Sequence, residues 1–241
     1  MSDARSTPDP PPDWRPAAQA LFGERLVFAR RFAELLVTRG TKQGLLGPRE
    51  GQRIWERHLL NSAVLTEALL AEERVADVGS GAGLPGIPLA LARPDLHLTL
   101  IEPMERRCVF LREVVSELAL DERVVVVRGR APECAKQLVP VTTVVARAVA
   151  PLNRLVSWTM PLCQPGGRLL ALRGRTAEHE VETMRADIGR AGGEGLSLTV
   201  LGRGLLPEPV NVVEVRRSTV QARNATGRRG DARHGGGSNR R

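Results

Sequence analysis

Three glycines, Gly79, Gly81 and Gly83, follow a short apolar segment that starts at Arg74. Glycine has no Cβ atom, so the backbone at such positions can turn tightly and lie directly against a ligand. The residues that follow, 86–92, are almost all apolar and predict a helix, with a proline near its start where no hydrogen bond is lost. A strand, a glycine turn and a helix in this order are typical of a nucleotide-binding βα unit.

Two acidic residues indicate which nucleotide the turn would hold. The spacing Gly81-x-Gly83-x-x-Gly86 satisfies the dinucleotide fingerprint, so NAD is one candidate. Asp77, however, would repel a pyrophosphate, and it suits an ammonium group such as the amino-acid end of S-adenosylmethionine. Glu102 ends the next apolar segment, where a ribose-binding acid belongs. We therefore expect the residues of this set to bind S-adenosyl-L-methionine: Asp77, Gly79, Gly81, Gly83 and Glu102.

Composition narrows the class of protein. The 241 residues favour one α/β domain with short additions, and no apolar segment approaches the ~20 residues that span a bilayer. The first 16 residues contain no apolar stretch typical of a secretory signal, so we expect a cytoplasmic protein. The three cysteines are widely spaced and the four histidines are scattered, which predicts neither a disulfide framework nor a metal site.

The net charge of +8 is concentrated at the C-terminus. Residues 216–241 contain eight arginines and a single acidic residue, so the rest of the chain is close to neutral. A basic segment of this kind predicts a partner with nucleic-acid phosphates. A disordered, solubilising end explains the same composition, and the two interpretations stay open.

Hydrophobic periodicity predicts the elements that would position these residues. We expect a disordered leader over 1–13, and an N-terminal helical cap over 14–73 made of one helix from about Arg15 to Gly40 and another from about Glu50. A methyltransferase-like domain follows over 74–217, and a disordered Arg/Gly-rich tail over 218–241. The expected strands are 74–79, 97–102, 123–128, 142–147, 167–173, 196–201 and 210–216, and the helices between them are 85–93, 105–119, 131–138, 151–163 and 176–192.

This alternation of strands and helices predicts an α/β fold with a mostly parallel sheet. The last two strands are separated only by residues 202–209, too few for a crossover helix, so the final pair should be antiparallel. The fold class we expect is therefore Rossmann-like: a seven-stranded, mostly parallel sheet with an antiparallel last strand, the arrangement of S-adenosylmethionine-dependent methyltransferases.

Four segments together resemble one family. They are RHLLNS at 57–62, DVGSGAGLPGIP at 77–88, ARAVA at 146–150 and ALRG at 171–174. The chain is similar over roughly residues 20–217 to the small-subunit ribosomal RNA guanine-N7 methyltransferases, also called glucose-inhibited division protein B. The resemblance implies a class I methyltransferase that acts on N7 of guanine 527 in 16S ribosomal RNA. Its partner would be the small ribosomal subunit, and we expect a monomer without a metal.

The resemblance also implies site residues. Gly79 and Leu84 would contact the cofactor, the backbone of Ala131 and Pro132 would lie near the adenine, and Arg147 would line the cofactor pocket. Three departures from the family occur. Gly44-Leu45-Leu46 stands where Asn-Leu-Thr is common, Pro132 replaces an acidic residue, and Arg173 replaces a lysine.

Guanine N7 has an in-plane lone pair and no proton, so methyl transfer to it needs no general base. Orientation alone can contribute about 7–11 kcal/mol to such a displacement. We expect Arg57, His58 and Arg147 to shape the guanine side of the site. Alternatives remain at this point: the Arg57-His58 pair could be structural, and Arg147 could bridge a carboxylate across the sheet. The whole chain could also be an NAD-dependent oxidoreductase, a non-catalytic RNA-binding assembly factor or a small-molecule methyltransferase.

Overall fold

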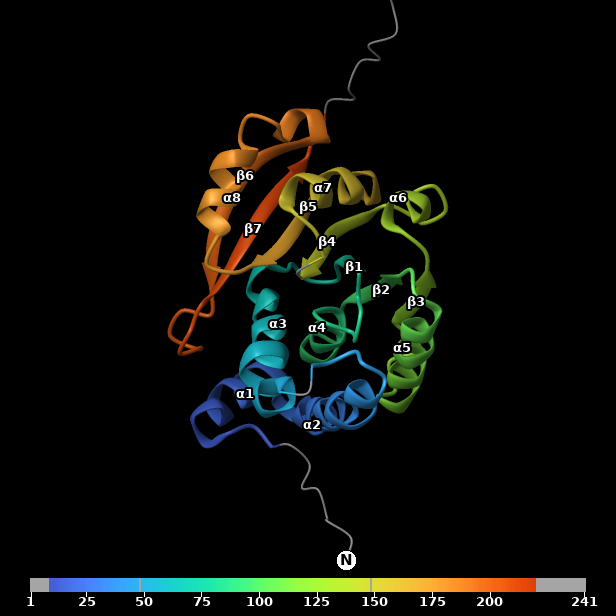
Figure 1. Ribbon diagram of the computed structural model, residues 1–241, viewed down its shortest axis with the longest axis vertical. Helices are drawn as coiled ribbons and strands as arrows, with labels where there is room; N and C mark the ends of the chain where they lie inside the picture. The colour runs from blue at the N-terminus through green and yellow to red at the C-terminus, as the bar shows by residue number, and fades with distance from the viewer. Residues whose placement is uncertain (1–8, 48, 148, 220–241) are drawn as a thin grey trace, which may run out of the picture.

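The computed structural model describes residues 9–47, 49–147 and 149–219, and these form one seven-stranded sheet with helices on both faces (Figure 1). The strand order is β3-β2-β1-β4-β5-β7-β6, in which β1 to β5 are parallel and β7 is antiparallel to both of its neighbours. The predicted fold class is thereby confirmed. The strands are β1 (Arg74–Val78), β2 (His97–Glu102), β3 (Val124–Arg128), β4 (Val141–Arg147), β5 (Cys163–Arg173), β6 (Gly193–Leu201) and β7 (Val210–Arg217).

The first predicted helix is interrupted in the structure. Gly23 has φ 51°, a conformation that L side chains rarely adopt, and it separates α1 (Arg15–Phe22) from α2 (Leu26–Leu35). Short helical turns flank these helices: η1 (Pro12–Trp14), η2 (Gly23–Arg25) and the π-helical η3 (Leu36–Gly40). The prediction of one helix over this range was therefore wrong at Gly23.

The second predicted helix begins at Glu50, as expected, but changes its hydrogen bonding along its length. It runs through η4 (Glu50–Arg53), the π-helical η5 (Ile54–Leu60), α3 (Asn61–Ala63) and η6 (Val64–Ala68). Arg57 and His58 lie in the π-helical part, a geometry often found at functional sites. The two helical segments pack with the sheet in one hydrophobic cluster, so the cap and the sheet share a core.

Helices on the two faces of the sheet come from different parts of the chain (Figure 1). The cap, α4 (Gly86–Ala92) and α5 (Glu105–Glu117) cover one face, and α6 (Ala131–Cys134), α7 (Leu152–Thr159) and α8 (Ala177–Met184) cover the other. Two turns, η7 (Met160–Leu162) and η8 (Ile188–Ala191), complete the second face. The helices α6 and α8 are shorter than the sequence predicts.

Side-chain alternation along the strands decides which residues reach the site. Successive strand residues point to opposite faces, so Val75 packs in the core under the cap, while Ala76 packs in the core of the other face. Asp77 therefore points toward the cap, and it pairs with Leu100 on β2 and Val145 on β4.

The residues two positions further along those neighbouring strands, Glu102 and Arg147, share this face at the carboxyl edge of the sheet. Because these positions on three neighbouring strands point to the same face, Asp77, Glu102 and Arg147 lie together beneath the cap.

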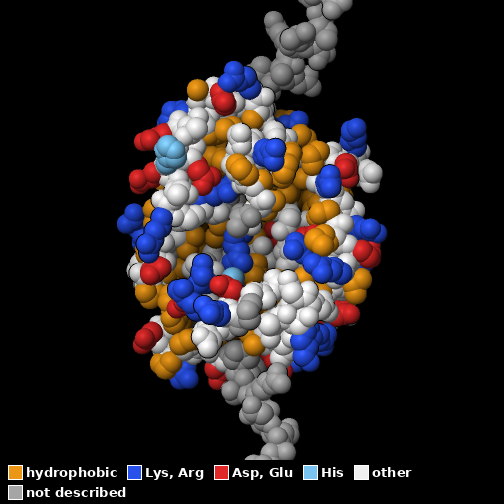
Figure 2. Space-filling view, in the orientation of Figure 1, with side chains coloured by type: hydrophobic (Ala, Val, Ile, Leu, Met, Phe, Trp, Pro, Cys, Tyr) orange, Lys and Arg blue, Asp and Glu red, His pale blue; other side chains and the backbone are white. Residues whose placement is uncertain are grey.

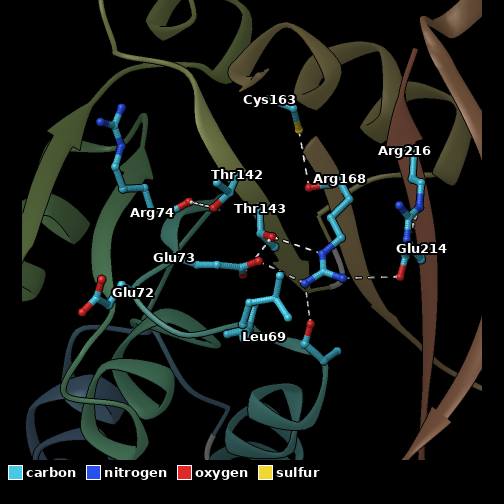
Figure 3. A network of polar contacts seen from close by, with 12 residues as sticks. Leu69, Glu72, Glu73, Arg74, Thr142, Thr143, Cys163, Arg168, Glu214 and Arg216 are labelled. Atoms are coloured by element: carbon cyan, nitrogen blue, oxygen red, sulfur yellow. Dashed lines mark hydrogen bonds and ion pairs between the residues drawn. The ribbon is translucent and has the colours of Figure 1, made fainter. Parts of the chain in front are cut away.

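A polar network fastens the cap to the opposite, amino edge of the sheet (Figure 3). Arg168 on β5 donates to the carbonyl of Ala68, at 2.5 Å, and to Glu73 Oε1 and Thr143 Oγ1, both at 3.2 Å. Thr143 donates to the other oxygen of Glu73, at 3.1 Å, and Glu214 on β7 lies 3.9 Å from Arg168. The guanidinium of Arg168 on β5 therefore joins Ala68 and Glu73, at the end of the cap, to β4 and β7.

Candidate active site

Two adjoining cavities open along the carboxyl edge of the sheet. The larger, about 640 Å³, lies between the cap and the ends of β1, β2 and β4, and the smaller, about 400 Å³, lies over the ends of β1, β2 and β3. Both are bordered by Gly79, Pro103 and Val149, so the two cavities adjoin one another at these residues. Figure 2 shows this face hollowed over the end of β4, with basic side chains inside the hollow and around its opening.

The glycine turn forms the floor between the cavities. Gly79, Gly81 and Gly83 all have positive φ, at 72°, 57° and 93°. A Cβ atom added at Gly79 would lie 2.9 Å from Val149, and one at Gly83 would lie 2.7 Å from Ile87. Gly79 and Gly83 therefore require glycine for both conformation and space, and Gly81 requires it for conformation alone.

Asp77 lies beneath this turn and does not line either cavity. Its side chain is fully buried, and Oδ2 accepts a hydrogen bond from the Gly86 amide at 3.1 Å. Oδ1 has no hydrogen-bond partner among the described residues. Burial raises the pKa of Asp77 to about 7, and the hydrogen bond from Gly86 and, to a smaller extent, the positive charge of Arg147 oppose this rise. Its contact with a cofactor ammonium group stays a prediction.

Glu102 holds the loops on both sides of the larger cavity. Its Oε2 accepts from the Gly81 amide at 3.0 Å, and its Oε1 accepts from the Met104 amide at 2.9 Å. Arg107 lies 3.7 Å away and adds a positive charge. The carboxylate is buried yet borders the cavity, and each oxygen has a second lone pair available for a ligand hydroxyl.

Arg147 is held by the cap. Its Nη2 lies 2.8 Å from His58 Nδ1, and its Nη1 donates to the carbonyl of Arg57 at 3.1 Å. His58 Nε2 lies 2.7 Å from Glu50 Oε2, and the other oxygen of Glu50 lies 3.3 Å from Arg57. Desolvation lowers the pKa of Arg147 to about 10, so this side chain is positively charged at neutral pH.

The structure brings most of the predicted residues to these cavities. Gly79, Gly81, Leu84 and Glu102 border the larger one together with Arg57, His58 and Arg147. The smaller one is bordered by Ala131, Pro132 and, again, Gly79. Asp77 and Gly83 border neither cavity and instead support the turn.

Sequence reasoning missed several residues of the site. Glu50 is the most informative, because it precedes Arg57 and His58 by seven and eight positions, which places all three on one side of two helical turns. That spacing was a usable signal. Val149 and Met104 carry no chemical signal in the sequence, since an apolar side chain in a loop predicts no contact. Residues 45–47 also border the larger cavity, and two of them, Leu45 and Leu46, belong to the segment 44–46 that departs from the family sequence.

The part of the chain that the structure describes holds no group of three metal-ligating side chains, and none of its helices has the length and apolar character that crossing a bilayer requires.

Solved structures share the fold at low sequence identity. The S-adenosylmethionine-dependent methyltransferase SibL, in its apo form, is 19% identical with a TM-score of 0.54, over 85% of this chain and 70% of that one. The [4+2]-cyclase SpnF is 16% identical with a TM-score of 0.53, over 81% of this chain and 96% of that one. Because these two proteins are named for different reactions, the fold by itself assigns no activity.

Sequence relatives are much closer. A protein of Mycobacterium sp. (strain KMS), named ribosomal RNA small subunit methyltransferase G, is 52% identical over 89% of this chain and 95% of its own length. A protein of the same name from Streptomyces coelicolor is 52% identical over 89% of this chain and 88% of its own. The family model GidB, described as rRNA small subunit methyltransferase G, matches residues 26–206. This chain therefore belongs to the GidB family of S-adenosylmethionine-dependent methyltransferases.

Proposed function

We propose that this protein transfers a methyl group from S-adenosyl-L-methionine to N7 of guanine 527 in the 16S RNA of the small ribosomal subunit. The observation that supports it best is the pair of adjoining cavities at the carboxyl edge of the sheet. The glycine turn and Glu102 border the cavities on the side of the core, and Arg147 and His58 border the larger one on the side of the cap. In α/β sheets of this kind, ligands bind outside the carboxyl ends of the strands. The names of the relatives support the ribosomal RNA substrate.

The residues of the two cavities fit S-adenosylmethionine. The smaller cavity is mostly apolar, and Ala131 and Pro132 at its wall suit an adenine ring. Glu102 stands where the cavities meet the turn and suits the ribose hydroxyls. Asp77 offers a buried carboxylate whose Oδ1 lacks a partner among the described residues, and it lies next to the turn on which the amino-acid end would rest.

The cofactor supplies an electrophilic methyl group on a sulfonium centre. The chain itself contributes orientation: the glycine turn fixes the cofactor backbone, and Glu102 fixes its position along the edge. His58 has both ring nitrogens engaged, by Glu50 and Arg147, so it is not free to act as a general base. This agrees with an acceptor atom that carries no proton.

Arg57 and Arg147 supply positive charge at the acceptor side. The side chain of Arg57 is 51% exposed at the rim of the larger cavity, where it can approach an RNA phosphate. Arg147 lies deeper and shapes the wall. We propose that the protein acts as a cytoplasmic monomer on the small subunit, and that basic side chains around the hollow face in Figure 2 receive the RNA.

The test is methyl transfer from labelled S-adenosylmethionine to small ribosomal subunits and, in parallel, to naked 16S RNA. We expect label on N7 of a single guanine, identified by mass spectrometry, and a loss of this label in Arg147→Ala. Label on an exocyclic amino group or on protein would overturn the assignment. Cofactor binding without any transfer would favour the non-catalytic assembly factor instead.

A further inference from the structure

Among the described residues of the cap, Glu50 is the one acidic side chain that borders the larger cavity. It is the first residue of η4, and its two carboxylate oxygens contact different residues of η5: Oε2 lies 2.7 Å from His58 Nε2, and Oε1 lies 3.3 Å from Arg57 Nη1. The hydrogen bond to His58 lowers the pKa of Glu50, so this carboxylate is ionised at neutral pH. It can therefore only accept hydrogen bonds.

The contact on the other side of the imidazole settles the position of its proton. Arg147 Nη2 lies 2.8 Å from His58 Nδ1, and a guanidinium can only donate. Nδ1 must then carry the lone pair, and the proton must sit on Nε2, where it is donated to Glu50. Burial and the positive charge of Arg147 lower the pKa of His58, which favours the same neutral form.

The order of the three groups gives each a distinct role. Glu50 accepts from the imidazole, the imidazole accepts from Arg147, and the carbonyl of Arg57 accepts from the second nitrogen of the same guanidinium. Two fixed acceptors define the plane of the Arg147 side chain. A proton moved from Nε2 to Nδ1 would place two N–H groups face to face and displace Arg147 from this position.

We propose that Glu50 is a positioning residue, which holds His58 as its Nε2–H tautomer and thereby orients Arg147 at the methyl-transfer site. This inference rests on the proposed function for its kinetic consequences, but its structural content does not depend on the substrate. The contact between His58 and Arg147 also joins the cap to the end of β4.

The first experiment is a double-mutant cycle between Glu50 and His58. The variant His58→Asn retains an acceptor where Nδ1 stands, but its side chain is too short to donate to Glu50 from the position of Nε2, and it does not titrate. We expect Glu50→Ala to lower kcat/KM for the cofactor about tenfold, the effect of losing one charge-assisted hydrogen bond. In the His58→Asn background, Glu50→Ala should lower kcat/KM by no more than about twofold, because the imidazole through which Glu50 acts is already absent.

Two further variants separate positioning from charge and from general damage. Glu50→Gln retains an acceptor for Nε2–H and should recover most of the activity that Glu50→Ala loses. Glu56→Ala is the matched control: Glu56 lies on the same segment, pairs with Arg53 at the surface and borders neither cavity, so its kinetics should match those of the unmodified protein. Additive losses at Glu50 and His58, or a Gln variant no better than the Ala variant, would overturn the proposal.

A second measurement needs neither substrate nor catalysis. The ¹⁵N chemical shifts of the imidazole nitrogens distinguish the two neutral tautomers, and His58→Asn identifies the signals of His58 among the four histidines. We expect a protonated Nε2 and an unprotonated Nδ1 near pH 7.5. A protonated Nδ1 would overturn the proposal even if the enzyme is active. If His58 shows the expected tautomer but the protein methylates no guanine, the result would contradict the proposed function and leave the role of Glu50 intact.

Discussion

Asp77 has the most unusual environment of any acidic residue in the site. Its side chain is fully buried, one oxygen accepts from the Gly86 amide, and the other has no partner among the described residues. Burial raises its pKa to about 7 from an ordinary value of 3.8. The folded protein therefore binds a proton more tightly at Asp77 than the unfolded chain does.

This difference makes stability depend on pH with a definite sign. Between about pH 4 and pH 7 the folded state holds more protons, so the stability contributed by the neutral carboxyl is full at the acid end and is lost as the pH rises through 7. The loss at pH 8 is on the order of 4 kcal/mol at most, from the size of the pKa shift.

Asp77→Asn should remove this dependence. Asparagine keeps an acceptor for the Gly86 amide and stays neutral at every pH, so the stability of the variant relative to the unmodified protein should increase from pH 5 to about pH 7 and then level off toward pH 8. Urea unfolding of both proteins across this range measures the difference. A difference that is the same at every pH would mean that the carboxyl of Asp77 titrates in its ordinary range when folded.

At the scale of elements, the strands were predictable and several helices were not. Alternating apolar segments placed all seven strands within a few residues, because a buried strand must be apolar wherever it contacts a core. The break at Gly23 could not be foreseen, since glycine is also tolerated inside helices and its presence alone does not show that it adopts a positive φ. The π-helical hydrogen bonding around His58 has no signal in the periodicity either.

The same limit applies to the site. Glycines and acids at strand ends marked the turn, but the sequence could not show that Asp77 supports the turn from below while Glu102 borders the cavity. Both side chains point to the same face of the sheet, but they lie at different distances from its carboxyl edge. Asp77 lies one residue before the end of β1, whereas Glu102 is the last residue of β2.

The polar network at the amino edge makes a prediction about elements. Arg168→Met should lower the free energy of unfolding by about 3–5 kcal/mol, because it leaves the carboxylate of Glu73, whose side chain is 7% exposed, without its cation. Adding Glu73→Gln to this variant should recover part of the loss. Arg216→Met is the control, since its side chain is 57% exposed and its pair with Glu214 is worth less than about 1 kcal/mol.

Urea unfolding provides the free energies, and calorimetry provides the cofactor affinity of the folded variants. We expect that affinity to be unchanged, because Arg168 and its partners lie at the amino edge of the sheet and border neither cavity. Equal losses in Arg168→Met and Arg216→Met would show that the buried cation adds nothing to the attachment of the cap.

For the molecule as a whole, the cap is fastened to the sheet at two edges with different consequences. At the amino edge Arg168 binds the end of the cap, and this contact stabilises the fold. At the carboxyl edge Arg147 binds His58, which concerns the geometry of the site. The strand β7 runs antiparallel to β5, and Arg216 lies opposite Arg168 in the register of the two strands. β7 therefore ends at the amino edge of the sheet, away from the cavities.

The C-terminal segment should therefore affect RNA binding without affecting chemistry. Residues 220–241 lie outside the described part of the chain, as do residues 1–8 of the expected leader, but residues 219–241 carry six arginines and one aspartate. Deleting 219–241 should raise KM for the small subunit, leave kcat unchanged and flatten the salt dependence of RNA binding, by about 0.7 in the logarithmic slope for each phosphate that the protein no longer neutralises. Replacing the six arginines with lysine preserves the charge and should preserve KM. If the deletion changes neither KM nor the slope, the segment serves solubility, and the RNA is held by the basic side chains around the cavities alone.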